Sequence, residues 1–142
     1  MDLDKKFGFV LAFGTAAVTI FLLTGSVSDP VNAPKLFILG GVGVAAIFLV
    51  IVGLLRKQIN LSRVDLVAIF FVVWSMISAA KSSSPISQNL YGVYGRNTGL
   101  ITYLLFTFIF LAASKIRFQR NFKPVLLAFI IATGINVLYG TW

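Results

Sequence analysis

The stretch LFILGGVGVAAIFLVIVGLL, residues 36–55, contains no Asp, Glu, Lys or Arg. At about 1.5 Å per residue, a helix of this length measures roughly 30 Å, which matches the hydrocarbon core of a bilayer. A helix also satisfies its backbone hydrogen bonds internally, which lipid requires. The stretch therefore predicts a membrane-spanning α-helix.

Four further uncharged apolar runs lie on either side of this one, at residues 7–24, 66–80, 97–114 and 124–142. The run 66–80 measures only roughly 22 Å as a helix, so it spans only if residues 82–84 extend it or if the membrane thins locally. We predict an all-α, polytopic integral membrane protein that forms a single transmembrane region. Its five transmembrane helices are expected at about 7–24, 36–55, 65–83, 97–114 and 124–142.

The composition argues against a water-soluble domain. Hydrophobic residues make up 58% of the chain and the mean hydropathy is +0.97, whereas apolar residues make up roughly 45–50% of a soluble domain. The net charge is +8, but the basic residues are spread in small groups between the apolar runs. This spacing is typical of membrane topology and does not indicate a nucleic-acid partner.

Lys and Arg alternate between the segments that separate the runs. Nine of them fall on one predicted side of the membrane: Lys5, Lys6, Arg56, Lys57, Arg63, Lys115, Arg117, Arg120 and Lys123. Three fall on the other side: Lys35, Lys81 and Arg96. Because positive charges concentrate in cytoplasmic loops, the N-terminus is predicted to be cytoplasmic and the C-terminus to face outward. The expected location is the bacterial inner membrane, in a multi-pass arrangement with lipids as partners.

The residues that usually carry enzyme chemistry are largely missing. The sequence contains no His, Cys or Glu, so common nucleophile, base and metal-ligand sets cannot be built. Of the four Asp residues, Asp29 is predicted on the outer side and the others on the inner side. We therefore predict no metal, no cofactor and no acid–base catalysis by this chain unaided.

Three local patterns predict structural contacts. Ser62-Arg63-Val64-Asp65 resembles a capping box, so Asp65 is expected to cap a helix, with a proton carrier as the alternative. The glycines of the second run are expected to admit a close helix neighbour. Asn136 is expected to form a hydrogen bond between helices, with substrate contact as the alternative.

Recognition chemistry concentrates in the longest outer segment, which reads QNLYGVYGRNTG over residues 88–99. Arg96 carries a planar guanidinium suited to phosphate oxygens, and Lys35 is a second outer cation. Tyr91 and Tyr94 offer flat faces that can stack on sugars. An equally simple reading is that Arg96 and the tyrosines anchor a helix end at lipid headgroups.

The order of these pieces resembles the N-terminal part of bacterial O-antigen ligase and O-antigen polymerase-like membrane proteins. The resemblance rests on SDPVNAPK at residues 28–35, on the Arg-Lys inner turn that leads to Asp65, and on the Gly92 to Gly99 segment, which ends in GRNTGL. It covers nearly all of this chain but only the first part of such a protein.

The resemblance implies a glycosyltransferase that uses an undecaprenyl-diphosphate-linked glycan at the periplasmic face, as in lipopolysaccharide biosynthesis. In that family, outer arginines engage the diphosphate, and by position Arg96 is the residue here best placed for this role, with Lys35 a weaker candidate. The family's His- and Arg-containing loop has no counterpart here. The chain is then expected to be inactive alone and to need the remaining helices of a longer or split protein. The alternatives are a small non-enzymatic subunit that packs in a larger helical assembly and, less well supported, part of a transporter.

Overall fold

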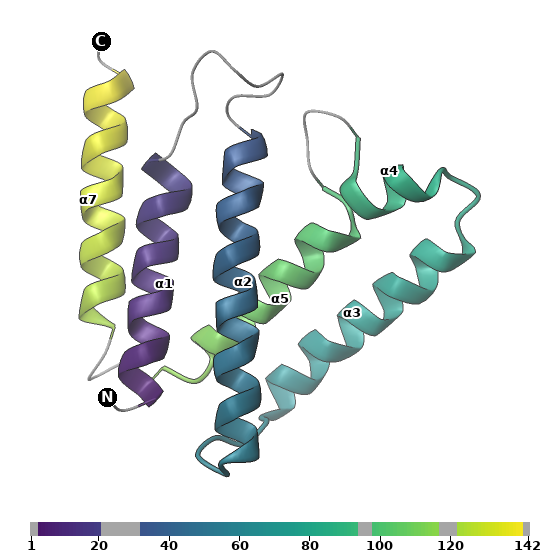
Figure 1. Cartoon of the computed structure of the whole chain (residues 1–142), viewed down its shortest axis with the longest axis horizontal. Coiled ribbons are helices and arrows are strands. Elements are labelled where there is room, and N and C mark those ends of the chain that lie inside the picture. Colours follow the sequence, from purple (N-terminus) through teal and green to yellow (C-terminus); the bar gives the residue numbers. More distant parts are fainter. Residues whose placement is uncertain (1–2, 21–31, 94–97, 117–121, 141–142) are drawn as a thin grey trace.

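The computed structural model describes residues 3–20, 32–93, 98–116 and 122–140, and within these ranges it contains helices and no strand (Figure 1). The predicted all-α class is confirmed. The helices are α1 (Leu3–Ile20), α2 (Asn32–Leu55), α3 (Arg63–Lys81), α4 (Ile86–Tyr91), α5 (Leu100–Ala113) and α7 (Lys123–Gly140).

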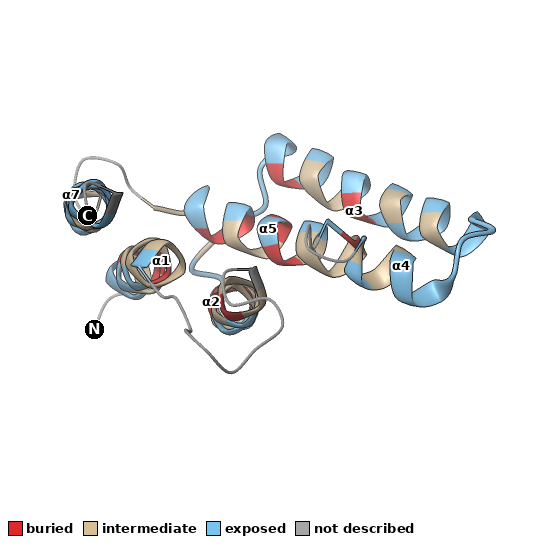
Figure 2. Ribbon diagram, turned by 90° about the horizontal axis from the view of Figure 1, so that it is seen from above, coloured by how far each residue is buried: buried red, intermediate tan, exposed pale blue. Residues whose placement is uncertain are grey.

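The helices pack in an open row. α7 lies against α1, α1 against α2, α2 against α5, and α5 against α3, while the short α4 packs on α5 (Figure 2). In Figure 1, α1, α2 and α7 run side by side, and α3 and α5 are inclined to them as a second, antiparallel pair. The row leaves one face of α3 without a protein neighbour among the described helices.

The chain reverses direction at each turn, so the segments sort to two ends. The N-terminus, the α2–α3 turn and the start of α7 lie at one end, and the C-terminus, the start of α2 and α4 lie at the other (Figure 1). We call the first the basic end, because the described cations Lys5, Lys6, Arg56, Lys57, Arg63, Lys115 and Lys123 belong to its segments. The opposite end is called the pocket end.

α2 ends in a hydrogen-bonded C-terminal turn. The Gln58 amide donates to the carbonyl of Gly53 at 2.9 Å, and the Lys57 amide donates to the carbonyl of Leu54 at 3.0 Å. Lys57 adopts a left-handed conformation with φ of 53°. This pair of bonds is the Schellman motif that satisfies the last carbonyls of a helix. It turns the chain sharply towards α3.

The capping box predicted at the start of α3 is confirmed. The Ser62 side chain accepts a bond from the Asp65 amide at 3.3 Å, and the Ser62 amide donates to Asp65 Oδ2 at 2.6 Å. Helix α3 therefore begins at Arg63, earlier than the predicted residue 65. It also ends earlier, at Lys81 and not at residue 83, because Ser82 adopts an extended conformation with ψ of 140°.

Asp65 also joins α3 to the end of α5. Its carboxylate accepts a bond from Ser114 Oγ at 2.6 Å and forms an ion pair with Lys115. Lys115 Nζ donates in addition to the carbonyl of Asn60 at 2.9 Å. Asp65 is fully buried, so its charge is neutralised and hydrogen-bonded inside the protein.

The hydrophobic core lies near the basic end, where α1, α2 and α5 meet. Its buried residues are Phe7, Ala46, Val50, Leu111 and Ala112. Phe7 is 1% exposed, and Ala46 and Ala112 are small enough for the three helices to approach closely. Towards the pocket end, α5 diverges from the row.

The predicted helix ends needed further correction. α1 begins at Leu3, not at residue 7, so the charged leader joins the helix, and residues 21–24 lie outside the described ranges. α2 begins at Asn32, four residues early, and α5 is shortened to Leu100–Ala113. α4 was not predicted, because its six residues carry no long apolar run.

Two of the described helices are long and apolar enough to cross a membrane: Ala33–Leu55 within α2, and Arg63–Lys81. The other three expected spans are not confirmed. α1 includes Asp4, Lys5 and Lys6, and the apolar parts of α5 and α7 are 14 and 17 residues long, Leu100–Ala113 and Lys123–Tyr139. Only 28% and 11% of the two qualifying windows are buried in the protein, so neither is the enclosed core helix of a globular domain.

Two further features suit an apolar environment. Large side chains project outward from every long described helix, including Phe9, Phe37, Phe70, Phe106 and Leu138, which are each more than half exposed. Hydroxyls inside the helices donate to carbonyls of their own helix, as the i−4 bonds of Thr15 (2.8 Å), Ser75 (2.8 Å) and Thr107 (2.9 Å) show. Internal pairing of this kind removes polar groups from contact with lipid.

The glycine prediction holds for part of α2, and the Asn136 prediction is confirmed. A Cβ on Gly43 would lie 2.7 Å from Leu105 of α5, whereas Gly40 and Gly41 face open space. Asn136 Nδ2 of α7 donates to the carbonyl of Thr19 in α1 at 3.4 Å and to that of Ala132 at 2.8 Å. The amide therefore links the two helices of the α1–α7 pair.

Candidate functional site

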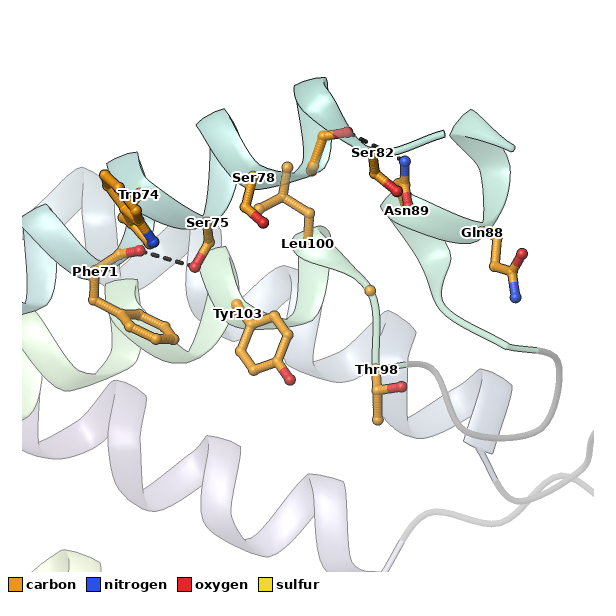
Figure 3. A pocket seen from close by; sticks show the side chains of 12 residues that line it. Phe71, Trp74, Ser75, Ser78, Ser82, Gln88, Asn89, Thr98, Leu100 and Tyr103 are labelled. Atoms are coloured by element: carbon orange, nitrogen blue, oxygen red, sulfur yellow. Dashed lines mark hydrogen bonds between the residues drawn. The ribbon is translucent and has the colours of Figure 1, made fainter. Parts of the chain in front are cut away.

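A polar pocket of about 470 Å³ opens at the pocket end between α3 and α5, with α4 along one side (Figure 3). Its described lining combines aromatic rings with hydroxyl and amide groups, and none of these described residues is charged: Phe71, Trp74, Ser75, Ser78, Ala79, Ser82, Gln88, Asn89, Thr98, Gly99, Leu100 and Tyr103. Its volume falls in the range of small-molecule sites. The described helices thus bound an open, polar concavity at this end.

α4 is held across the end of α3 by Asn89. Asn89 Nδ2 donates to the carbonyls of Ala79 at 3.2 Å and Ser84 at 3.3 Å. The first bond adds a second donor to a carbonyl in the last turn of α3, which also accepts the amide of Ser82 at 3.3 Å. Pro85 occupies the N-cap position of α4, where a proline disfavours helical backbone in the residue before it. Gln88 and Asn89 of α4 thereby form one side of the pocket.

Two glycines close the base of the segment between α4 and α5. Gly92 has φ of 84°, and a Cβ there would lie 2.6 Å from the amide nitrogen of Thr98. A Cβ on Gly99 would lie 2.2 Å from the carbonyl oxygen of Leu90. Both positions therefore require glycine. Through these close approaches the residues before α5 lie against the end of α4, and Thr98 and Gly99 line the pocket.

The hydroxyl groups of the pocket fall into two kinds. Ser75 Oγ is bonded to the carbonyl of Phe71 at 2.8 Å. For the hydroxyls of Ser78 and Tyr103, no hydrogen bond to any described residue is found, and Figure 3 draws both without a dashed line. Both residues are exposed. They are available to donate to a ligand and to accept from it.

The aromatic residues give the pocket flat apolar faces. Trp74 is 63% exposed and stacks on Phe70 with ring centroids 6.3 Å apart. Phe71 and Tyr103 meet edge to face at 6.0 Å across the α3–α5 contact. Exposed rings beside hydroxyl and amide groups suit a ligand with alternating apolar and hydroxylated faces, as a sugar ring has.

The predicted site residues are only partly brought to this pocket. Tyr91 is the last residue of α4 and is 56% exposed, but it does not line the pocket. Lys35 lies in the first turn of α2, at the same end of the molecule. Tyr94 and Arg96 lie outside the described residues, within the segment that Gly92 and Gly99 close. These assignments therefore remain predictions.

The sequence reasoning missed the residues that line the pocket. Trp74 and Ser78 are spaced four apart on one face of α3, and Ser82 follows four residues later as its C-cap. A polar face towards one end of an apolar helix was the available signal. Tyr103 carried no comparable signal, because one tyrosine in an aromatic run is equally consistent with lipid contact.

The polar cluster at the basic end has a structural role. Asp65 is a cap and an ion-pair partner, as described above, and its contacts leave it no exposed oxygen for proton exchange. In the parts of the chain that the structure describes, no group of three metal-ligating side chains occurs. The pocket is therefore the candidate site, and it is suited to binding.

No protein-family model, curated protein sequence or solved structure matches this chain. Its function is therefore argued from the site.

Proposed function

We propose that this chain is a multi-pass protein of the bacterial inner membrane and binds the headgroup of an undecaprenyl-diphosphate-linked glycan. In this proposal it serves glycan transfer similar to that of O-antigen ligases and polymerases. The single observation that carries the proposal is the pocket itself, with free hydroxyls and exposed rings, beside the segment that contains Arg96. The glycan occupies the pocket, and Arg96 binds the diphosphate.

The location of the pocket supports the periplasmic assignment. It lies at the end opposite most of the described cations, and positive charges favour the cytoplasmic side. Since the sequence has no His, Cys or Glu, we assign the chain to holding the donor lipid and not to catalysing transfer by itself. The proposal includes five membrane crossings, by α1, α2, α3, α5 and α7, of which α5 is the shortest helix.

Binding of undecaprenyl diphosphate carrying one N-acetylhexosamine to the chain in nanodiscs tests the proposal. Ser78→Ala and Tyr103→Phe each remove one hydroxyl that has no hydrogen bond to a described residue, and each should weaken binding about two- to tenfold, the range for a single neutral hydrogen bond. Ser75→Ala is the matched control, because this hydroxyl lines the same pocket but is already bonded to Phe71. It should bind like the unchanged chain.

The same titration separates the two roles open to Arg96. A guanidinium bound to the diphosphate predicts about ten- to hundredfold weaker binding in Arg96→Ala. Unchanged binding would leave Arg96 as a headgroup anchor. The proposed pocket would be rejected if the unchanged chain and all four variants (Ser75→Ala, Ser78→Ala, Tyr103→Phe and Arg96→Ala) bound the lipid equally.

A non-enzymatic membrane subunit is the second candidate. It is favoured by the open backbone at Gly40 and Gly41, where a further helix has room to pack closely. This candidate predicts no saturable binding of the glycan lipid in the same titration.

A further inference from the structure

A second cavity of about 400 Å³ continues from the polar pocket along the contact between α3 and α5. We call it the α3–α5 groove, and its lining is Val64, Val67, Ala68, Phe71, Tyr103, Phe106, Thr107 and Phe110. Phe71 and Tyr103 line both cavities, so the two meet at this pair of rings.

The chemistry of the lining changes at those two rings. On the pocket side the walls include several hydroxyl and amide groups beside the rings, whereas on the groove side they are almost entirely aliphatic and aromatic. Among the described residues of the groove, the one polar side chain besides Tyr103 is Thr107, which donates to the carbonyl of Tyr103 at 2.9 Å and is 8% exposed. Beyond the Tyr103 hydroxyl, the groove therefore offers no free polar group of a described side chain.

The groove is open to the surroundings of the protein. Val67 is 67% exposed and Phe106 is 55% exposed, because α3 has no neighbour besides α5 on this face among the described helices. From Tyr103 to Phe110 the groove follows α5 for about 10 Å, at 1.5 Å per residue. In a membrane, hydrocarbon reaches it directly.

We propose that the α3–α5 groove binds the hydrocarbon chain of the same lipid whose headgroup occupies the polar pocket. A ligand that fills both cavities must be polar at one end and apolar at the other, with its junction beside Phe71 and Tyr103. An apolar partner helix would account for the groove but not for its continuity with a polar pocket. The inference rests on the proposed function for the identity of the headgroup.

Photocrosslinking tests this assignment. The probe is undecaprenyl diphosphate with a diazirine on an isoprene unit near the diphosphate, bound to the full chain in nanodiscs and mapped by mass spectrometry. Labels are expected on Phe106, Phe110 or Val67, and unlabelled undecaprenyl diphosphate should compete for them. A phosphatidylethanolamine probe should not concentrate there.

Ala68→Phe fills the groove and should reduce probe affinity on the order of tenfold, the effect of removing about two methylene groups from apolar contact. Ala80→Phe is the matched control, because this residue lies on the same helix outside both cavities. Circular dichroism establishes that each variant is folded. Phe110→Ala, which shortens the wall without adding bulk, should also weaken binding.

The outcomes separate the two proposals. Glycan binding that depends on Ser78 and Tyr103, with labels scattered over all outward faces, would overturn the groove and keep the pocket. Competed labels in the groove, with no effect of the pocket variants, would keep the groove and reject the pocket. Crosslinks between two copies of the chain through Phe106 would show that a second copy covers the groove and would overturn the inference.

Discussion

At the scale of single residues, Asp65 is the most constrained group that the structure describes. It accepts bonds from the Ser62 amide, from the Ser62 and Ser114 hydroxyls, and from Lys115. These donors belong to the α2–α3 turn and to the end of α5. A buried carboxylate requires such a set, because an unpaired charge out of water is costly. Asp65 therefore fixes the geometry at which α3 leaves α5.

Lys115→Met should destabilise the protein by about 3–5 kcal/mol, because it leaves the buried carboxylate without its cation. Lys123→Met removes an exposed cation at the same end and should change stability by less than about 0.5 kcal/mol. Adding Asp65→Asn to Lys115→Met should restore part of the loss, since the uncompensated charge disappears. Unfolding in detergent micelles measures all three, and equal effects of the two lysine changes would contradict the role assigned to the ion pair.

The cap at Asp65 was predictable, but its ion pair was not. The S-x-x-D pattern lies within four consecutive residues, so its hydrogen bonds follow from helix geometry alone. Lys115 lies 50 residues away along the chain. Its contact depends on how α3 and α5 cross, and a basic residue after an apolar run carries no signal of that crossing.

At the scale of elements, the glycines of α2 divide by what lies opposite them. Gly43 faces Leu105 of α5, with a virtual Cβ 3.4 Å from the Leu105 backbone, and Gly53 faces Leu3 of α1 and Ile59. At Gly40 and Gly41, no atom of a described residue lies within 4 Å of a virtual Cβ. The same residue type thus makes a close helix contact at one position and leaves an open surface one turn earlier.

Gly43→Leu should cost about 1–3 kcal/mol, because α5 must move away to accommodate the side chain. Gly40→Leu introduces the same side chain into open space on the same helix and should be neutral or slightly stabilising, since leucine favours helix more than glycine does. Thermal unfolding of the two variants in one detergent gives the comparison. A larger loss for Gly40→Leu would mean that the packing of α2 on α5 is misassigned.

The existence of the long helices followed from the sequence, whereas their ends and the short α4 did not. Long uncharged apolar runs are a strong signal because backbone pairing in lipid permits little else. The ends depend on side chains such as Ser62 and Asn89, which pair with particular amides and carbonyls, and on the left-handed backbone of Lys57. The pocket forms where those helix ends meet. The sequence therefore indicated the segment 88–99 beside the pocket but not the residues of α3 and α5 that line it.

At the scale of the whole molecule, charge and topology agree. The described cations that the sequence assigns to the cytoplasm belong to segments at the basic end, and Lys35 and Lys81 belong to segments at the pocket end. α3, with 19 residues, measures about 28 Å, but α5, with 14, measures only about 21 Å. The inclined α3–α5 pair therefore spans fully only if the bilayer adapts around α5 or the residues beyond its ends contribute.

Because the chain has no cysteine, a single introduced cysteine reports on which side of the membrane a helix end lies, without labelling elsewhere in the chain. Ser83→Cys and Gln58→Cys bracket α3, and Thr98→Cys and Lys123→Cys bracket α5; all four positions are exposed. If both helices cross the inner membrane with the N-terminus inside, an impermeant thiol reagent should label positions 83 and 98 in intact spheroplasts. Positions 58 and 123 should react only after permeabilisation, which also controls for accessibility. The reverse pattern would invert the orientation, and labelling of both members of a pair on one side would show that the helix between them does not cross.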